Sequence, residues 1–329
     1  MAMQQMLLAG SGELIAIVSA TTTNLNASTL FGANYGAGVA KRLIINPGVT
    51  VGGTSAGTPA LTIPSGLTGS LIIDNYGSIQ GAGGVAGTAG VGGVGGDAIL
   101  AQSACRIINN TGATIYSGGG GGGRGGTGGT GGGGSYGGLG SYQYLGESGW
   151  YYGIGSNYAA RCAAVCGYTF GGSYANVYAS ISRYTNPASG CGGCDCCNDD
   201  NAQSANAFCC YGQPYITIFT AGGAGGGGGN GGRGRGYNQA LATGSAGVVG
   251  AAGGANAGAG GTGGSGGTGG DWGATGVNGS TGGTGANGNN GAGSAGATGS
   301  AGGLAGFYIN GLSTFVTLTN SGTVAGRSN

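Results

Sequence analysis

Residues 258–291 read GAGGTGGSGGTGGDWGATGVNGSTGGTGANGNNG, and glycine occupies every third position of this stretch without a miss. A left-handed helix of the polyproline-II type has three residues per turn, so this spacing puts the glycines in one column. Such a column leaves one side of the helix bare, and a neighbouring backbone can then come close. Extended helices cannot pair their own N–H and C=O groups and need lateral partners. We therefore predict stacked polyglycine-II helices and not a flexible linker.

The composition narrows the class of protein. Among 329 residues there are 92 glycines but only 5 prolines, too few for collagen. Nine Lys and Arg face 8 Asp and Glu, so we expect no basic surface for nucleic acid. The chain has no His, and its few carboxylates are scattered, which leaves no acid–base pair. We predict a protein that is not an enzyme and needs no cofactor.

Four glycine tracts divide the chain at 81–96, 118–134, 222–236 and 244–306. The last tract slips register after Gly253 and after Gly291, and slips are natural turn sites. We also expect the chain to fold back at Asp271-Trp272 or at 287–290. Residues 260–270 carry two glycine columns and 273–291 mostly one, so the first should have more neighbours than the second.

A second repeat combines a short apolar run, an Asn-x-Gly turn and β-branched residues, which predicts strand, turn, strand. Its copies are LIINPGVTV (43–51), LIIDNYGSI (71–79), IINNTGATI (107–115) and FVTLTNSGTV (315–324). The resulting fold class is a β-rich N-terminal domain plus a glycine-rich polyglycine-II helix sandwich with a disulfide-stapled irregular insert, and little or no α-helix. We expect a β-rich attachment domain (1–80), a first glycine-rich layer with short strands (81–134), an insert (135–221), a second glycine-rich layer (222–306) and a C-terminal strand pair (307–329).

The N-terminus carries no targeting signal that we can recognise. Its apolar stretch, 14–18, lacks a positively charged flank and is interrupted by Glu13, so we expect no signal peptide. No segment reaches the length of a membrane span.

Eight of the 9 cysteines lie within the insert. They are Cys162, Cys166, Cys191, Cys194, Cys196, Cys197, Cys209 and Cys210. A loop poor in apolar core favours disulfides, while Cys191-x2-Cys194 also has the spacing of a zinc ligand pair, and free thiols are a third reading. We favour disulfides and no metal, and expect Cys105 to be buried or to pair outside this set. Asp195, Asp199 and Asp200 fit either a calcium site or a solvated turn.

Tyrosine also crowds into the insert, beside Ser, Gly and Asn. This mixture is typical of binding loops, because Tyr gives rigid contact area at low entropic cost; a small aromatic core is the alternative. The candidate binding residues are Tyr142, Tyr144, Trp150, Tyr151, Tyr152, Tyr158, Tyr174, Tyr178 and Tyr184.

The glycine tracts with an aromatic segment between them resemble the distal long-tail-fibre adhesins of T-even-type bacteriophages. The resemblance covers 81–306 and implies a polyglycine-II sandwich whose loops bind a host receptor, an outer-membrane protein or a glycan, non-covalently. It also implies a place at the virion tail tip and docking onto a preceding tail or fibre protein through residues 1–80. A monomer capping a trimeric fibre and a homotrimer both fit. This chain departs from the family in two respects. It has one long insert where family members have several short variable loops, and the insert is rich in cysteine.

The repeats are also similar to the glycine-rich antifreeze proteins of snow fleas. Ice binding would use a flat row of threonines, namely Thr262, Thr268, Thr275, Thr281 and Thr284. That reading, like a passive structural surface protein, does not account for the aromatic insert.

Overall fold

The computed structural model describes residues 6–8, 12–140, 143–148, 174–183 and 206–329. These residues are mostly β-structure with little helix, as the sequence predicts. The chain divides into two compact units. Unit 1 combines Met1–Gly134 with Ala221–Asn329, and unit 2 is Ser135–Thr220.

Three sheets of unit 1 form a β-solenoid, because the chain visits them in turn and returns one strand further along each time. The first sheet has the order β1 (Met6–Leu8), β2 (Leu14–Val18), β5 (Lys41–Ile45), β8 (Leu71–Asn75), β11 (Cys105–Asn109) and β18 (Val316–Asn320). The second contains β3 (Thr22–Thr23), β6 (Thr50–Gly52), β9 (Ser78–Gln80), β12 (Thr114–Tyr116) and β19 (Thr323–Ala325). The third contains β4 (Leu25–Asn26), β7 (Leu61–Ile63), β10 (Ile99–Ala101), β17 (Phe307–Asn310) and β20 (Arg327–Ser328). Neighbouring strands are parallel except β1, which pairs antiparallel with β2.

Residues in register on successive coils stack into columns that fill the solenoid. Leu61, Ile99 and Ile309 form one such column in the third sheet, and all three side chains are fully buried. In the first sheet Leu43, Ile73 and Ile107 do the same. Each coil alone has too little apolar surface to fold, so stacking supplies the core.

The Asn-x-Gly turns link the first sheet to the second. The predicted strand–turn–strand repeats are confirmed, but the two strands of one repeat enter different sheets and pair with other coils. Inside this corner Asn75 Nδ2 donates to Asn109 Oδ1, and Asn109 Nδ2 donates to Asn320 Oδ1, both at 2.8 Å. Stacked amides therefore satisfy one another along the coils.

Short helices fill the corner between the first two coils. They are α1 (Ala27–Phe31) and η1 (Gly32–Gly36), and α3 (Leu312–Phe315) occupies the equivalent corner before β18. Asn26 caps α1 by accepting the Ser28 N–H, as a short amide side chain does at a helix start. Lys41 is fully buried, and its ammonium donates to the carbonyls of Ala37, Val39 and Thr68. These bonds use all three donors of the ammonium, while burial lowers the pKa of Lys41.

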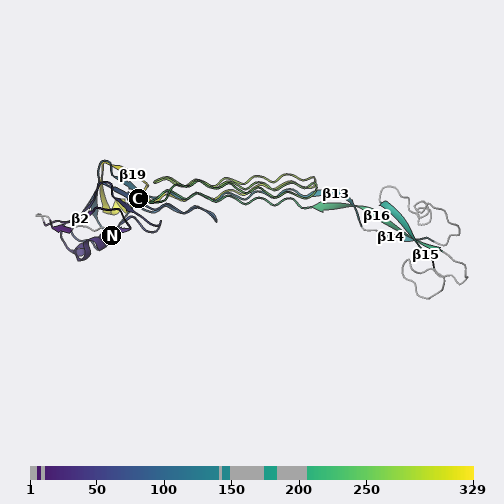
Figure 1. Cartoon of the computed structure of the whole chain (residues 1–329), viewed down its shortest axis with the longest axis horizontal. Coiled ribbons are helices and arrows are strands. Elements are labelled where there is room, and N and C mark those ends of the chain that lie inside the picture. The colour runs from purple at the N-terminus through teal and green to yellow at the C-terminus, as the bar shows by residue number, and fades with distance from the viewer. Residues whose placement is uncertain (1–5, 9–11, 141–142, 149–173, 184–205) are drawn as a thin grey trace. The chain divides into compact units, whose positions relative to one another are not determined.

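All glycine tracts leave the solenoid at one corner, between the second and third sheets. One residue spans this corner in the first coil (Asn24) and the last coil (Gly326), whereas 81–98 and 117–306 are inserted there in the third and fourth coils. The inserted chain forms extended segments that run side by side (Figure 1). We number them I (81–87), II (90–97), III (117–133), IV (221–235), V (240–253), VI (257–271), VII (274–287) and VIII (292–306).

Segment III lies at the centre of this bundle, where backbone hydrogen bonds join it to I, II, IV, VI, VII and VIII. Its partners change with a period of three. Gly118, Gly119 and Gly120 donate to segments II, IV and VII, and the next three residues repeat this order. Every column of III therefore faces a neighbour, and a Cβ on these glycines would collide with backbone atoms.

One column of segment III carries side chains only beyond the point where segments I and II end. Segments I and II form a short hairpin whose last contact is the bond from Arg124 N–H to Gly90 C=O, 3.0 Å. A Cβ on Gly118 or Gly121 would strike segment I. Further along the same column stand Arg124, Thr127 and Thr130, and both threonines are exposed. In residues 118–130, GGGGGGRGGTGGT, the first side chain of this column therefore appears where the hairpin of segments I and II ends.

Outer segments have fewer neighbours and fewer glycine columns. Segment VI, with two columns, bonds to III, IV, V and VII, whereas VII, with one, bonds to III, VI and VIII. Turns lie at 272–273 and 288–291, which confirms both predicted sites of folding back.

Serine hydroxyls accept hydrogen bonds from backbone N–H groups of the adjoining segment. Ser245 Oγ accepts from Asn230 N–H at 2.8 Å, and Ser280 Oγ from Ser265 N–H at 2.7 Å. Ser294 Oγ accepts from Thr130 N–H at 2.8 Å. In each pair the serine N–H donates to the carbonyl of the same partner residue. The N–H and the C=O of that partner are therefore both hydrogen-bonded.

The predicted domain boundaries need correction. Residues 1–80 and 307–329 are not separate domains, because their strands share three sheets with β10, β11 and β12. The predicted first glycine layer, 81–134, accordingly contains a coil of the solenoid. A local sequence pattern cannot predict that β11 pairs with β18 on the far side of the insertion 117–306. Only the turn motif that the coils share indicates it.

Gly126 offers a test of the bundle. A Cβ at Gly126 would overlap the carbonyl oxygen of Ala297, so Gly126→Ala should cost about 3 kcal/mol or prevent folding. Its exposed neighbour supplies the control, since Thr127→Ala should change stability by less than about 0.5 kcal/mol. Thermal unfolding of both variants measures the difference; equal melting temperatures would contradict the close backbone contact.

Candidate functional site

Unit 2 is built on a four-stranded sheet around a long central strand. The strands are β13 (Gly134–Leu139), β14 (Gln143–Ser148), β15 (Tyr174–Arg183) and β16 (Asn206–Thr220), and β16 pairs with each of the others. The prediction of an irregular insert is therefore wrong for these residues. Strands such as YANVYASISR carry Tyr, Ser and Asn where a clear alternation of Val and Ile would have signalled β-structure.

Strand register brings three tyrosines to one level. Tyr144 on β14 lies opposite Tyr211 on β16, and Tyr178 on β15 lies opposite the same Tyr211. Tyr174 lies opposite Pro214. The sequence places Tyr144, Tyr174 and Tyr178 in the binding set but not Tyr211, which only the register reveals. We name Tyr144, Tyr178 and Tyr211 the tyrosine row.

Most other predicted residues of the insert lie outside the described residues. This holds for Tyr142, Trp150, Tyr151, Tyr152, Tyr158, Tyr184, Cys162, Cys166, Cys191, Cys194, Cys196, Cys197, Asp195, Asp199 and Asp200. Cys209 and Cys210 stand on β16 opposite Ser180 and Ala179 of β15. The disulfide prediction stays a prediction.

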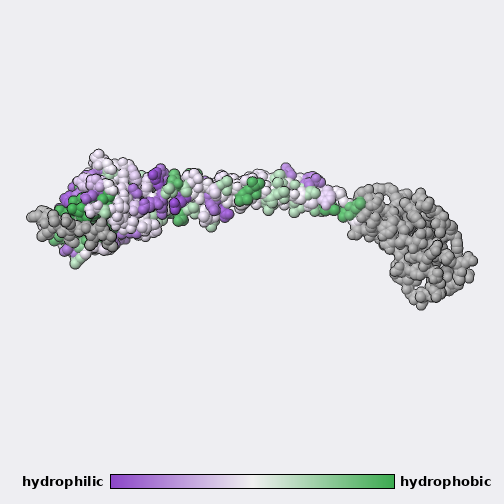
Figure 2. Space-filling model, viewed as in Figure 1, coloured by the Kyte–Doolittle hydropathy of each residue, from purple (hydrophilic) through white to green (hydrophobic). Residues whose placement is uncertain are grey.

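The bundle surface is weakly polar, with small apolar groups scattered along it (Figure 2). The proposed ice-binding threonines do not make one row. Thr262 and Thr268 belong to segment VI, and Thr275, Thr281 and Thr284 to segment VII. In VII the row is interrupted by Asn278, whose Oδ1 accepts the Gly302 N–H at 2.9 Å.

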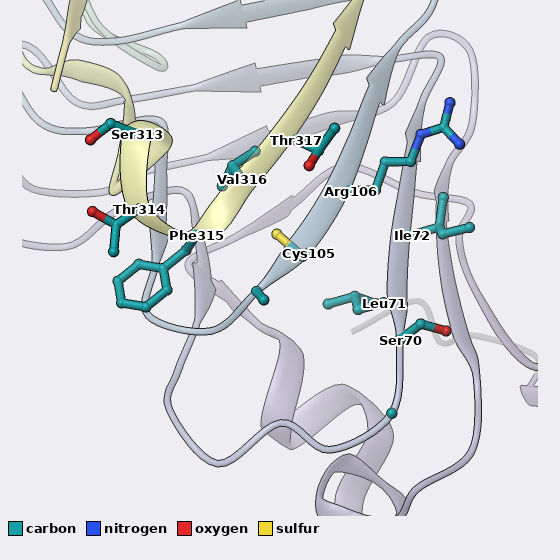
Figure 3. Close-up of a pocket in the computed structure, with 12 residues that line it drawn as sticks. Ser70, Leu71, Ile72, Cys105, Arg106, Ser313, Thr314, Phe315, Val316 and Thr317 are labelled. Atoms are coloured by element: carbon teal, nitrogen blue, oxygen red, sulfur yellow. The ribbon is translucent and has the colours of Figure 1, made fainter.

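A cavity of about 680 Å³ opens beside the first sheet of the solenoid. Figure 3 shows Phe315 and Val316 on one side, Ser70 and Leu71 on the other, and the Cys105 sulfur between them. Cys105 is buried and not in a disulfide, which agrees with the first of its two predicted states. Burial raises the pKa of its thiol to about 12. No sequence signal points to this cavity, because its walls come from three coils.

Among the described residues, no group of His, Cys, Asp or Glu is arranged to hold a metal ion. Within these ranges no helix has the length and apolar character to cross a bilayer.

The sequence from residue 13 to 196 matches the family of the phage tail fibre adhesin Gp38. The chain belongs to this family; it is a bacteriophage tail fibre adhesin, a host-attachment protein of the virion tail. Curated protein sequences contain no match. A solved structure, the gp37–gp38 adhesin tip complex of the bacteriophage S16 long tail fibre, is similar at 18% identity and a TM-score of 0.41. That match covers 98% of this chain and 85% of the other.

Cys105 should be chemically inert in the folded protein. With a pKa near 12, almost none of the thiol is ionised at pH 8, and the thiolate is the form that reacts. Iodoacetamide should therefore leave Cys105 unlabelled in native protein and label it after unfolding, as followed by peptide mass spectrometry. Rapid labelling of the native chain would show that the cavity admits solvent to the sulfur.

Proposed function

We propose that this adhesin recognises a host surface protein or glycan non-covalently through unit 2, while unit 1 supports it and attaches to the preceding fibre protein. The observation that carries the proposal is the tyrosine row, which stands on a sheet separate from the solenoid core. Tyrosine combines apolar contact area with a hydroxyl and has few rotamers to lose on binding. Binding alone would account for this activity, without catalysis or a cofactor.

The bundle of unit 1 is proposed to be a polyglycine-II sandwich. Lateral hydrogen bonds recur at every third residue, and glycine stands wherever a backbone approaches. Both features match a helix with three residues per turn. Because the backbone groups are tied to neighbours on several sides, the bundle should hold unit 2 with little loss of entropy on contact.

Disulfides among the insert cysteines are proposed to stabilise unit 2. A small sheet with many Gly, Ser and Tyr residues buries little aliphatic surface, and cross-links would offset this. The net charge of +1 suggests that receptor binding depends weakly on salt.

Removing unit 2 tests where recognition resides. Segments III and IV precede and follow unit 2 in the sequence and run side by side, with Gly131 N–H donating to Gly223 C=O at 2.8 Å. A short Gly-Ser linker can therefore replace 135–220 without strain. We expect the melting temperature of unit 1 to stay within a few degrees and host adsorption to disappear. Full adsorption by this variant would place the receptor site in unit 1.

The tyrosine row can be tested within the intact chain. Replacing Tyr144, Tyr178 and Tyr211 together by Ser should weaken binding to host cells by more than about a hundredfold, since hot-spot aromatics contribute about 2 kcal/mol each. Tyr136→Ser is the control, because this exposed tyrosine of β13 is not among the predicted contacts. Binding is measured by flow cytometry with labelled adhesin, and circular dichroism checks the fold. Equal losses in both variants would refute a specific contribution of the row.

A further inference from the structure

The last coil leaves one end of the solenoid open. All three sheets finish there, at β18, β19 and β20, and no described strand pairs with their outer edges. At the other end β1 covers the edge of the first sheet, while the second and third sheets end at the two-residue strands β3 and β4. Unpaired strand edges are templates for another strand unless charge, proline or a covering element blocks them. These three strands carry a single charged residue, Arg327, and no proline.

The apolar columns also end uncovered in this coil. Ile73 and Ile107 are fully buried, but Leu318, next in their column, is only partly buried. In the second sheet Ile79 and Ile115 are fully buried, and Val324 is again only partly so. A further layer would complete both columns.

The stacked amides of Asn75, Asn109 and Asn320 end at the same coil. Asn320 Oδ1 accepts from Asn109, while its Nδ2 has no acceptor among the described residues. Asn320 is exposed, so its amide is free to donate to an acceptor one coil further on, as Asn75 donates to Asn109.

The cavity beside Cys105 lies against this coil. Phe315, Val316 and Thr317 form one wall (Figure 3). A bulky apolar side chain presented next to β18 could enter it, and such anchors contribute most of the affinity in many interfaces.

From these observations, and resting on the proposed function, we propose that β18, β19 and β20 form the docking surface for the β-structured tip of the preceding fibre protein. The partner would add strand edges to the sheets, aliphatic side chains over Leu318 and Val324, and a carbonyl opposite Asn320. This moves the docking surface from the predicted 1–80 to 316–328. A second copy of this chain fits less well. If two β18 strands paired antiparallel about a twofold axis at Leu318, Asn320 would lie opposite Val316. The row of stacked asparagine amides would then not continue into the partner.

Three variants of the full chain test the proposal against tail fibres prepared without adhesin. Asn320→Asp keeps the acceptor that Asn109 uses and removes the donor, so binding should fall about tenfold, the worth of one lost hydrogen bond. Leu318→Lys with Val324→Lys should abolish binding. Ile108→Lys is the control, because it alters the outward face of β11 in the same sheet and should bind as the wild type does. Co-sedimentation measures binding, and thermal unfolding shows that each variant is folded.

Host-cell binding by the free variants separates this proposal from the proposed function. We expect it to be unchanged in all three, because unit 2 is intact. Undiminished fibre binding by Asn320→Asp and by the double variant would overturn the docking surface. Loss with Ile108→Lys alone would move it to the outer face of the first sheet. A wild-type dimer in solution that the double variant abolishes would instead identify a second copy as the occupant.

Discussion

Lateral hydrogen bonds between bare backbones are the interaction on which the rest of unit 1 depends. A Cβ at almost any inward glycine would meet a carbonyl or amide of the next segment, so these bonds exist only because side chains are missing. Ordering glycine is entropically costly, and one pair of segments would gain too little to offset that cost. Segment III instead has six neighbours, and bonds on several sides at once make the ordered state cooperative.

The solenoid makes this arrangement possible by fixing where the segments begin. Both insertions leave from one corner, in consecutive coils, so parallel strand pairing of β9 with β12 starts segments I and III in register. Gly81 N–H donates to Tyr116 C=O at that point, and Gly84 to Gly119 continues the same pattern into the bundle. Trp272 holds the turn between segments VI and VII against the same corner. Its ring lies 5.6 Å from that of Tyr116, and the Arg235 guanidinium lies 5.7 Å from its centre. A conventional apolar core thus sets the register of a bundle that has none.

Sequence pattern predicted local features well and distant pairings poorly. The glycine columns, the turns at 272–273 and 288–291, and the strand–turn–strand repeats follow from short-range chemistry, and each is present. The pairing of β11 (Cys105–Asn109) with β18 (Val316–Asn320) could not be derived. The strands are far apart in the sequence, and the residues VTLTN carry no signal for a particular partner strand. In the candidate site Tyr144 and Tyr178 were predicted from composition, whereas Tyr211 joins them only through strand register. The Cys105 cavity also depends on three coils meeting.

Side chains supply hydrogen-bond partners at the surface of the glycine bundle and at the last coil of the solenoid, and the latter is the proposed docking surface. On the bundle, Ser245, Ser280 and Ser294 turn hydroxyls onto N–H groups that would otherwise lack partners, and Asn278 and Asn287 do the same for segment VIII. At the last coil of the solenoid Asn320 accepts from Asn109, and the exposed Asn320 amide donates to no described residue. The outer edges of β18, β19 and β20 pair with no described strand, and this end of the solenoid is where we propose the fibre protein to add its own.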